Sequence, residues 1–204
     1  MRQLRSDEGV TLIELLTVTV LMGMVLALAY FMLDTVSTMA DNLQARTTAT
    51  DDTRAILDQV TRELRQGVEV SDGKGAFQRA QPRWCAFYAD LDHNGVPELI
   101  EYRVIGQTLY RYSTTSTTVV PPYSYPSTPN TTKQIATSLN GGWTGNVFTY
   151  YDGSNPPGEV SSGHADQVSA VRLELINGAT VNKKSVFVDL STWVRIRSVN
   201  NTID

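Results

Sequence analysis

The chain has 204 residues, of which 41% are hydrophobic, with 17 Lys and Arg against 21 Asp and Glu and a formal net charge of −4. Together with a mean hydropathy of −0.19, these averages exclude a disordered chain, a collagen-like repeat and a polytopic membrane protein. The negative charge also argues against a protein that binds nucleic acid through bulk charge. The averages conceal a strongly uneven distribution of apolar residues along the chain.

The first predicted element is a membrane-spanning helix over residues 10–33. This run of 24 residues contains 19 apolar ones. As a helix it would be about 36 Å long, enough for a hydrocarbon core of roughly 30 Å. It is too long for the apolar part of a cleaved secretory signal, and no small-x-small site follows Leu33. We therefore predict an anchor helix that follows a polar leader, residues 1–9.

Glu14 is the unusual residue of this helix, because a carboxylate inside a bilayer span costs a few kcal/mol. One interpretation gives it a partner, the free amino group of a chain that begins at Val10, supplied by a neighbouring copy or a related subunit. The other interpretation places Glu14 close enough to the interface to be hydrated. The residues alone leave both interpretations open.

Residues 9–16 read GVTLIELL and resemble the cleavage and methylation motif of type IV prepilins and pseudopilins, in which a glycine precedes F-T-L-I-E-L-L. Seven of the eight residues match, and the departure is Val10, where the family usually has Phe. The resemblance implies cleavage after Gly9 by a prepilin peptidase and N-methylation of Val10. It also implies that Glu14 pairs with a subunit N-terminus in a filament.

The same resemblance implies partners and a location. The partners are other pilins or pseudopilins in a hetero-oligomeric filament. The precursor would cross the bacterial inner membrane once, with its C-terminal domain outside the cytoplasm, before it joins a periplasmic or extracellular filament.

The helix is predicted to continue to about residue 66. No proline occurs before Pro82, and Gly67 is a plausible C-terminal stop. Residues 34–67 form an amphipathic half, whose apolar stripe is Val36, Met39, Leu43, Leu57, Val60 and Leu64. The polar middle of this stripe leaves an alternative of two helices with a break near residues 46–53.

Residues 68–204 are predicted to form an exported antiparallel β-sheet domain. The predicted strands are Trp84–Ala89, Leu99–Ile105, Thr108–Tyr112, Val147–Tyr151, Val168–Ile176 and Ser185–Arg197. Turns are expected at Gly106 and at Gly178, whereas residues 113–134 and 152–165 read as irregular surface loops. A long helix followed by a sheet against which it packs is an α+β, pilin-like fold. Residues 189–197 (DLSTWVRIR) resemble the final strand of J-type minor pseudopilins and minor type IV pilins.

Residues 90–101 match the pattern of a calcium loop, with oxygen ligands at alternate positions and a glycine at the sharp turn. Because the flanks are strands, the predicted ligands are Asp90, Asp92, Asn94, Glu98 and the Val96 carbonyl. Glu101 is the alternative ligand, at the position that closes a helical calcium loop. The other interpretation is a plain turn, since Asp, Asn and Gly are common in turns.

We expect that the chain is not an enzyme, because the spacing of the residues places no general base beside a candidate nucleophile. Cys85 lies in an apolar run, and the two histidines, His93 and His164, lie in a turn and a loop. One face of the last strand carries Trp193, Arg195 and Arg197, and Lys183 and Lys184 lie at the start of this strand. These side chains could contact nucleic acid. The alternative, a packed tryptophan beside arginines paired with carboxylates, is the one we predict, so nucleic acid is not an expected partner.

The sequence therefore predicts a structural subunit, a minor pilin or pseudopilin, of a type IV pilus or a type II secretion-like filament. One alternative is a DNA- or surface-binding pilus subunit for competence or adhesion. Another is a plain signal-anchored extracellular binding domain.

Overall fold

The computed structural model describes residues 11–70, 75–136, 145–181 and 184–196. The chain divides into two compact units, residues 1–44 and 45–204. In chain order the elements are α1 (Leu12–Arg65), β1 (Phe77–Gln81), β2 (Trp84–Ala89), β3 (Glu98–Ile105), β4 (Thr108–Thr114), β5 (Thr131–Ala136), β6 (Phe148–Tyr151), the 3-10 helix η2 (Ala165–Gln167), β7 (Ala170–Val181) and β8 (Lys184–Arg195).

α1 is one α-helix of 54 residues, without an interruption at residues 46–53, where the two-helix alternative placed a break. Arg62 and Arg65 in its last turn complement the helix dipole. The helix ends where the backbone N–H of Gly67 donates to the Leu64 carbonyl (3.1 Å). Gly67 then forms an isolated bridge with Ala89 of β2, so the chain leaves the helix directly towards the sheet.

In the first unit, the α1 residues up to Leu33 expose almost every large apolar side chain, Leu12 and Ile13 among them. This part of α1 is long and apolar enough to cross a membrane. The hydroxyls of Thr17 and Thr19 donate to the backbone carbonyls of Glu14 (2.9 Å) and Leu16 (2.8 Å). The threonines are therefore satisfied within the helix, and they add little polar surface to it.

The second unit contains a five-stranded antiparallel sheet in the order β1-β2-β3-β4-β5. The prediction for β2 is exact, and the Gly106 turn (φ 61°) joins β3 to β4 as expected. The prediction that residues 113–134 are irregular is wrong at both ends. β4 continues to Thr114, and β5 begins at Thr131, where β-branched threonines pair with β4 as an exposed edge strand.

The remaining strands form an antiparallel sheet in the order β6-β7-β8. The predicted turn at Gly178 is wrong, because β7 runs on to Val181 and Gly178 pairs with Phe187 of β8. An aromatic residue opposite a strand glycine compensates for the missing side chain, so the pairing passes this point. The predicted end of the last strand, Arg197, lies outside the described residues.

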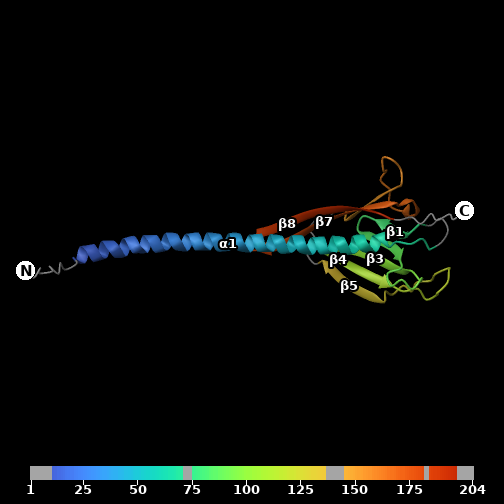
Figure 1. Ribbon diagram of the computed structural model, residues 1–204, viewed down its shortest axis with the longest axis horizontal. Coiled ribbons are helices and arrows are strands. Elements are labelled where there is room, and N and C mark those ends of the chain that lie inside the picture. The colour runs from blue at the N-terminus through green and yellow to red at the C-terminus, as the bar shows by residue number, and fades with distance from the viewer. Residues whose placement is uncertain (1–10, 71–74, 137–144, 182–183, 197–204) are drawn as a thin grey trace, which may run out of the picture. The chain divides into compact units, whose positions relative to one another are not determined.

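A single hydrophobic core joins α1 to both sheets of the second unit. Its fully buried members include Val60 and Leu64 of α1, Phe87 and Tyr102 of the first sheet, and Leu173 of the second. The backbone N–H groups of residues 147 and 148 both donate to the carbonyl of residue 82 (3.0 Å each), which ties the sheets together. Figure 1 shows the C-terminal part of α1 beside these strands. The predicted α+β fold, with a long N-terminal helix packed on antiparallel sheet, is confirmed.

Candidate functional site

The acidic loop between β2 and β3 is built around two residues with positive φ. Ala89 pairs with Glu98 in the last register of the hairpin, so residues 90–97 form the connection. His93 and Gly95 adopt φ values of 59° and 82°, which turn the chain sharply. Short Asp and Asn side chains surround these two positions, and they can hold such a turn by bonding to its backbone.

The loop carboxylates do bond to the backbone of the turn. Asp90 accepts the backbone N–H of Asn94 (3.1 Å) and of Gly95 (3.0 Å). Asp92 accepts the same Asn94 N–H (3.1 Å) and the Asn94 side-chain amide (2.7 Å). The Asn94 side-chain oxygen in turn accepts the Val96 N–H (2.7 Å). These hydrogen bonds are the ones expected of a plain turn, and they hold the carboxylates of Asp90 and Asp92 in place.

Three of the predicted calcium ligands come together in this loop. One oxygen each from Asp90, Asp92 and Glu98 lies within 4.8 Å of the others. Calcium–oxygen bonds of 2.3–2.6 Å place two ligands of one ion at most about 5 Å apart, so this spacing fits the donor set that calcium prefers. The Asn94 side-chain oxygen and the Val96 carbonyl belong to the same loop.

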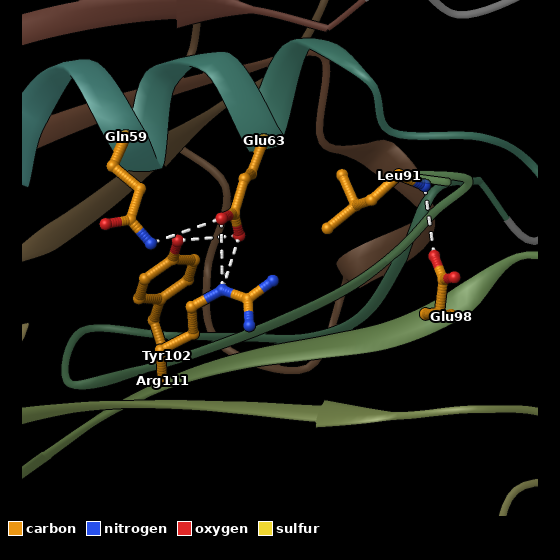
Figure 2. A network of polar contacts seen from close by, with 6 residues as sticks. All are labelled: Gln59, Glu63, Leu91, Glu98, Tyr102 and Arg111. Carbon is orange, nitrogen blue, oxygen red and sulfur yellow. Dashed lines mark hydrogen bonds and ion pairs between the residues drawn. The ribbon is translucent and has the colours of Figure 1, made fainter. Parts of the chain in front are cut away.

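Glu98 is buried at the start of β3, where its carboxylate accepts the backbone N–H of Leu91 (3.0 Å). Figure 2 shows this contact. Burial raises the pKa of Glu98 above its ordinary value, and the neighbouring charges of Asp92 and Asp90 raise it further. A divalent cation beside these carboxylates would relieve the repulsion that they exert on one another.

Glu101 is not brought to this group. It lies an odd number of positions from Glu98 on the same strand, so its side chain projects from the other face of the sheet. There it accepts the Trp84 indole N–H (2.8 Å) and forms an ion pair with Arg103. The guanidinium of Arg103 lies over the Trp84 ring, 4.0 Å from its centroid. Glu101 therefore stabilises side-chain contacts on the sheet and does not join the three loop carboxylates.

A second polar cluster, which the sequence did not predict, joins α1 to the first sheet. Glu63 of α1 accepts the Tyr102 hydroxyl (2.8 Å), the Arg111 Nε (2.8 Å) and the Gln59 side-chain amide (3.2 Å). Figure 2 shows all four side chains converging between helix and strands. A usable signal was present, since Glu63 falls three positions after Val60 on the apolar stripe, where an acidic residue needs a partner.

Electrostatics in this cluster keep the Tyr102 phenol neutral and the Arg111 guanidinium charged. Burial and the Glu63 charge both raise the pKa of Tyr102, which keeps its hydroxyl protonated as a donor. Burial acts to lower the pKa of Arg111, but the hydrogen bond and charge of Glu63 outweigh it and the pKa is raised. The cluster therefore fixes how the C-terminal part of α1 sits on the sheet.

The N-terminal motif is described only from Thr11 onward, because the processing residues Gly9 and Val10 lie outside the described residues. Glu14 lies exposed in the first turn of α1, where its backbone N–H donates to the Thr11 hydroxyl oxygen (3.3 Å). Within the part of the chain that the structure describes, its carboxylate has no hydrogen-bond or ion-pair partner. A carboxylate near a helix N-terminus interacts favourably with the helix dipole.

The predicted packing of Trp193 is wrong. The residue is 52% exposed, and its ring contacts that of Tyr151 with the two centroids 4.4 Å apart. Arg195 is also exposed and has no carboxylate partner among the described residues, whereas Lys183 and Arg197 lie outside them. The tryptophan is exposed because it projects from the outward face of the β6-β7-β8 sheet, opposite the buried Val194.

Cys85 and the histidines offer no reactive arrangement in the described residues. Cys85 is completely buried, and burial raises the pKa of its thiol to about 12, which leaves it protonated and inert. His93 lies in the acidic turn, and His164 precedes the short helix η2 on the surface.

Comparison with known proteins gives one type of match. No protein-family model and no curated protein matches the sequence. Among solved structures, the chain is similar to one in the crystal structure of the GspK-GspI-GspJ complex from the type 2 secretion system of enterotoxigenic Escherichia coli. The two chains are 16% identical, the match covers 74% of this chain and 98% of that one, and the TM-score is 0.45.

Proposed function

We propose that the chain is a structural subunit, a minor pilin or pseudopilin, of a type IV pilus or type II secretion-like filament. The observation that carries the proposal is Glu14. It is the only carboxylate among residues 10–33, it lies within an exposed apolar helical surface, and it has no side-chain partner in the described residues. The motif of residues 9–16 and the separate β-sheet unit support the same assignment.

In this proposal, prepilin peptidase cleaves after Gly9, and the new amino group of Val10 is methylated. The precursor sits in the inner membrane through residues 10–33, with its β-sheet domain outside the cytoplasm. Glu14 then pairs with the N-terminus of a neighbouring pilin as the helix enters the periplasmic or extracellular filament. Pairing offsets part of the cost of holding a carboxylate in an apolar environment, which makes Glu14 a determinant of assembly.

The test is the incorporation of a Glu14→Ala variant into filaments, in cells that carry the peptidase and companion pilins. We expect normal membrane insertion and cleavage but loss of incorporation. Thr19→Ala is the matched control, because this residue lies in the same helix and its hydroxyl donates to the backbone carbonyls of Leu15 and Leu16 in the preceding turn. Normal assembly of Glu14→Ala would refute the pairing role. A chain that is never cleaved would favour the signal-anchored binding domain.

A second candidate function is that of a surface-binding pilus subunit, and the exposed Trp193 favours it. A half-exposed tryptophan in contact with a tyrosine is the kind of surface that proteins use for recognition. This candidate is compatible with filament assembly, because the two roles use different ends of the chain.

We also propose that residues 90–98 bind calcium, with ligands from Asp90, Asp92, Asn94, Glu98 and the Val96 carbonyl. The convergence of three carboxylate oxygens within 4.8 Å supports this proposal. The ion would cross-link the β2–β3 turn and stabilise the domain, without a catalytic role.

A further inference from the structure

The outward face of the β6-β7-β8 sheet presents an aromatic pair. Side chains alternate between the two faces of a strand, and Val171, Leu173 and Val194 point into the core. Tyr151 and Trp193 therefore lie on the opposite face. Their ring planes are inclined by 37°, with centroids 4.4 Å apart. Trp193 is exposed and Tyr151 is half-buried, so the tyrosine packs against the tryptophan and the two form an aromatic platform on this face.

A cavity of about 660 Å³ opens beside this platform. One wall is Trp193 with its neighbours on β8, and the other is the loop of residues 152–157. The volume falls within the range of about 300–1,000 Å³ that is typical of small-molecule sites. Asp152 holds the loop in shape, because its carboxylate accepts the backbone N–H groups of Gly158 (2.8 Å) and Ser154 (3.0 Å).

The polar groups around the cavity include both donors and acceptors. Asp152 supplies an acceptor, Arg195 supplies donors, and the Asn155 amide and the Ser169 hydroxyl supply both. The opposite charges of Asp152 and Arg195 balance, and Arg172 on the same face is already paired with Glu174 (3.3 Å).

This near-neutral balance selects among ligand classes. A nucleic acid needs a surplus of cations, and a purely apolar ligand would leave the donors and acceptors without partners. A sugar ring needs no surplus of cations, and it offers both polar groups and an apolar face. Its hydroxyls can meet the polar groups, and its weakly positive C–H face can lie on the negative face of an indole ring.

We propose that this cavity is a binding site for a neutral saccharide, with one sugar ring stacked on Trp193 and its hydroxyls bonded to Asp152, Asn155 and Arg195. The site lies on a single sheet and its adjoining loop, so binding does not require filament assembly. A failure of assembly and a failure of saccharide binding are therefore separate results.

The test uses the full chain in a zwitterionic detergent without a sugar head group, since alkyl glycosides would compete for the site. The chain is applied to an array of neutral oligosaccharides, and bound ones are measured by saturation-transfer NMR. We expect the native chain to bind, and Trp193→Ala to weaken the affinity by at least about tenfold. Trp193→Phe, which keeps an aromatic ring, should lose less affinity than Trp193→Ala.

Phe187→Ala is the matched control. Phe187 is an exposed aromatic on the same face of β8 but does not line the cavity, so its removal should leave binding unchanged. No retention of any neutral oligosaccharide by the native chain would overturn the proposal, as would equal losses in the Trp193 and Phe187 variants. Trp193-dependent binding of oligo-dT without saccharide binding would also overturn it, in favour of a nucleic-acid site.

Discussion

Glu63 and Arg111 are 48 positions apart in the chain, yet the Arg111 Nε lies 2.8 Å from a carboxylate oxygen of Glu63. One residue belongs to α1 and the other to β4, and both side chains are largely buried. The ion pair therefore reports directly on how the C-terminal part of α1 sits on the five-stranded sheet. Tyr102, the cross-strand neighbour of Arg111, closes the cluster from β3.

Removing one partner of this pair should destabilise the second unit. Glu63→Ala leaves the Arg111 guanidinium buried without its carboxylate and leaves the Tyr102 hydroxyl without its acceptor. We expect the free energy of unfolding to fall by about 3 kcal/mol. The measurement is denaturant unfolding of the full chain in micelles, followed by near-UV circular dichroism from the buried aromatic residues.

Two variants make this result specific. Asp58→Ala removes an exposed carboxylate from the same helix and should change the free energy by less than about 0.5 kcal/mol. The double variant Glu63→Met, Arg111→Met should recover part of the loss, because neither charge is then buried alone. If Glu63→Ala and Asp58→Ala had equal effects, the cluster would not hold the helix.

Calcium should raise the melting temperature of the native chain, compared with the chelated protein, because an ion that binds only the folded loop stabilises it by mass action. Asp92→Ala removes one of the three convergent carboxylates and should abolish the rise. Thermal denaturation with and without a chelator measures both.

Glu101→Gln is the matched control for the calcium site. It removes the alternative ligand, whose carboxylate instead bonds to Trp84 and Arg103, so the calcium-induced rise should persist. Loss of the rise in this variant would assign the ligand to Glu101 rather than Glu98. The absence of any rise in the native chain would leave the loop as a plain turn.

The sequence predicts correctly those features that depend on residues close together in the chain. The helix was predictable because residues 10–66 contain no proline and one internal glycine, and β2 because WCAFYA is short and rich in apolar and aromatic residues. The three carboxylates of residues 90–98 were predictable as a group, since a hairpin brings nearby positions together.

The failures concern contacts between distant residues. β5 forms because residues 131–136 pair with β4, although the Ser/Thr/Pro-rich stretch that precedes them is typical of a loop. The Glu63 cluster needs three elements, and the exposure of Trp193 depends on which face of β8 the core covers. The position of Glu63 on the apolar stripe signals that its carboxylate needs a partner, but not that Tyr102 and Arg111 supply it. The pairing of β5 and the exposure of Trp193 are not encoded within a short window of the sequence, so periodicity and composition could not give them.

Processing at Gly9 should be visible in the mass of the mature chain. Co-expression with a prepilin peptidase should remove residues 1–9 and leave Val10 as an N-terminus that carries one methyl group. Gly9→Val should block cleavage, because the motif places a glycine directly before the cut. Intact-mass spectrometry of the membrane fraction measures both changes.

Glu8→Ala is the control for processing, since it alters the leader next to Gly9 without changing the residues from 9 to 16. This variant should be cleaved normally. Cleavage of the Gly9→Val chain at the same bond would contradict the prepilin-type motif. An unmethylated Val10 in an otherwise mature chain would leave cleavage supported and methylation refuted.

The lowered pKa of Asp152 predicts that the stability of the loop of residues 152–158 depends on pH. The Ser154 hydroxyl, the Gly158 N–H and the Ser154 N–H all donate to its carboxylate, and they hold its pKa below the ordinary value of 3.8. These bonds favour the ionised form. A depressed folded-state pKa means that the stabilisation is fully present above the unfolded-state pKa and is lost as the pH falls through the folded-state pKa.

An NMR titration of the Asp152 carboxyl carbon in the full chain tests this sign. The midpoint should lie below 3.8 in the native protein. Ser154→Ala removes the largest cause of the shift and should move the midpoint upward. Ser161→Ala alters another exposed serine, which makes no contact with Asp152 among the described residues, and should leave the midpoint unchanged. A native midpoint at or above 3.8 would mean that the hydrogen bonds of this loop do not hold in solution, since a carboxylate that accepts them cannot titrate like a free one.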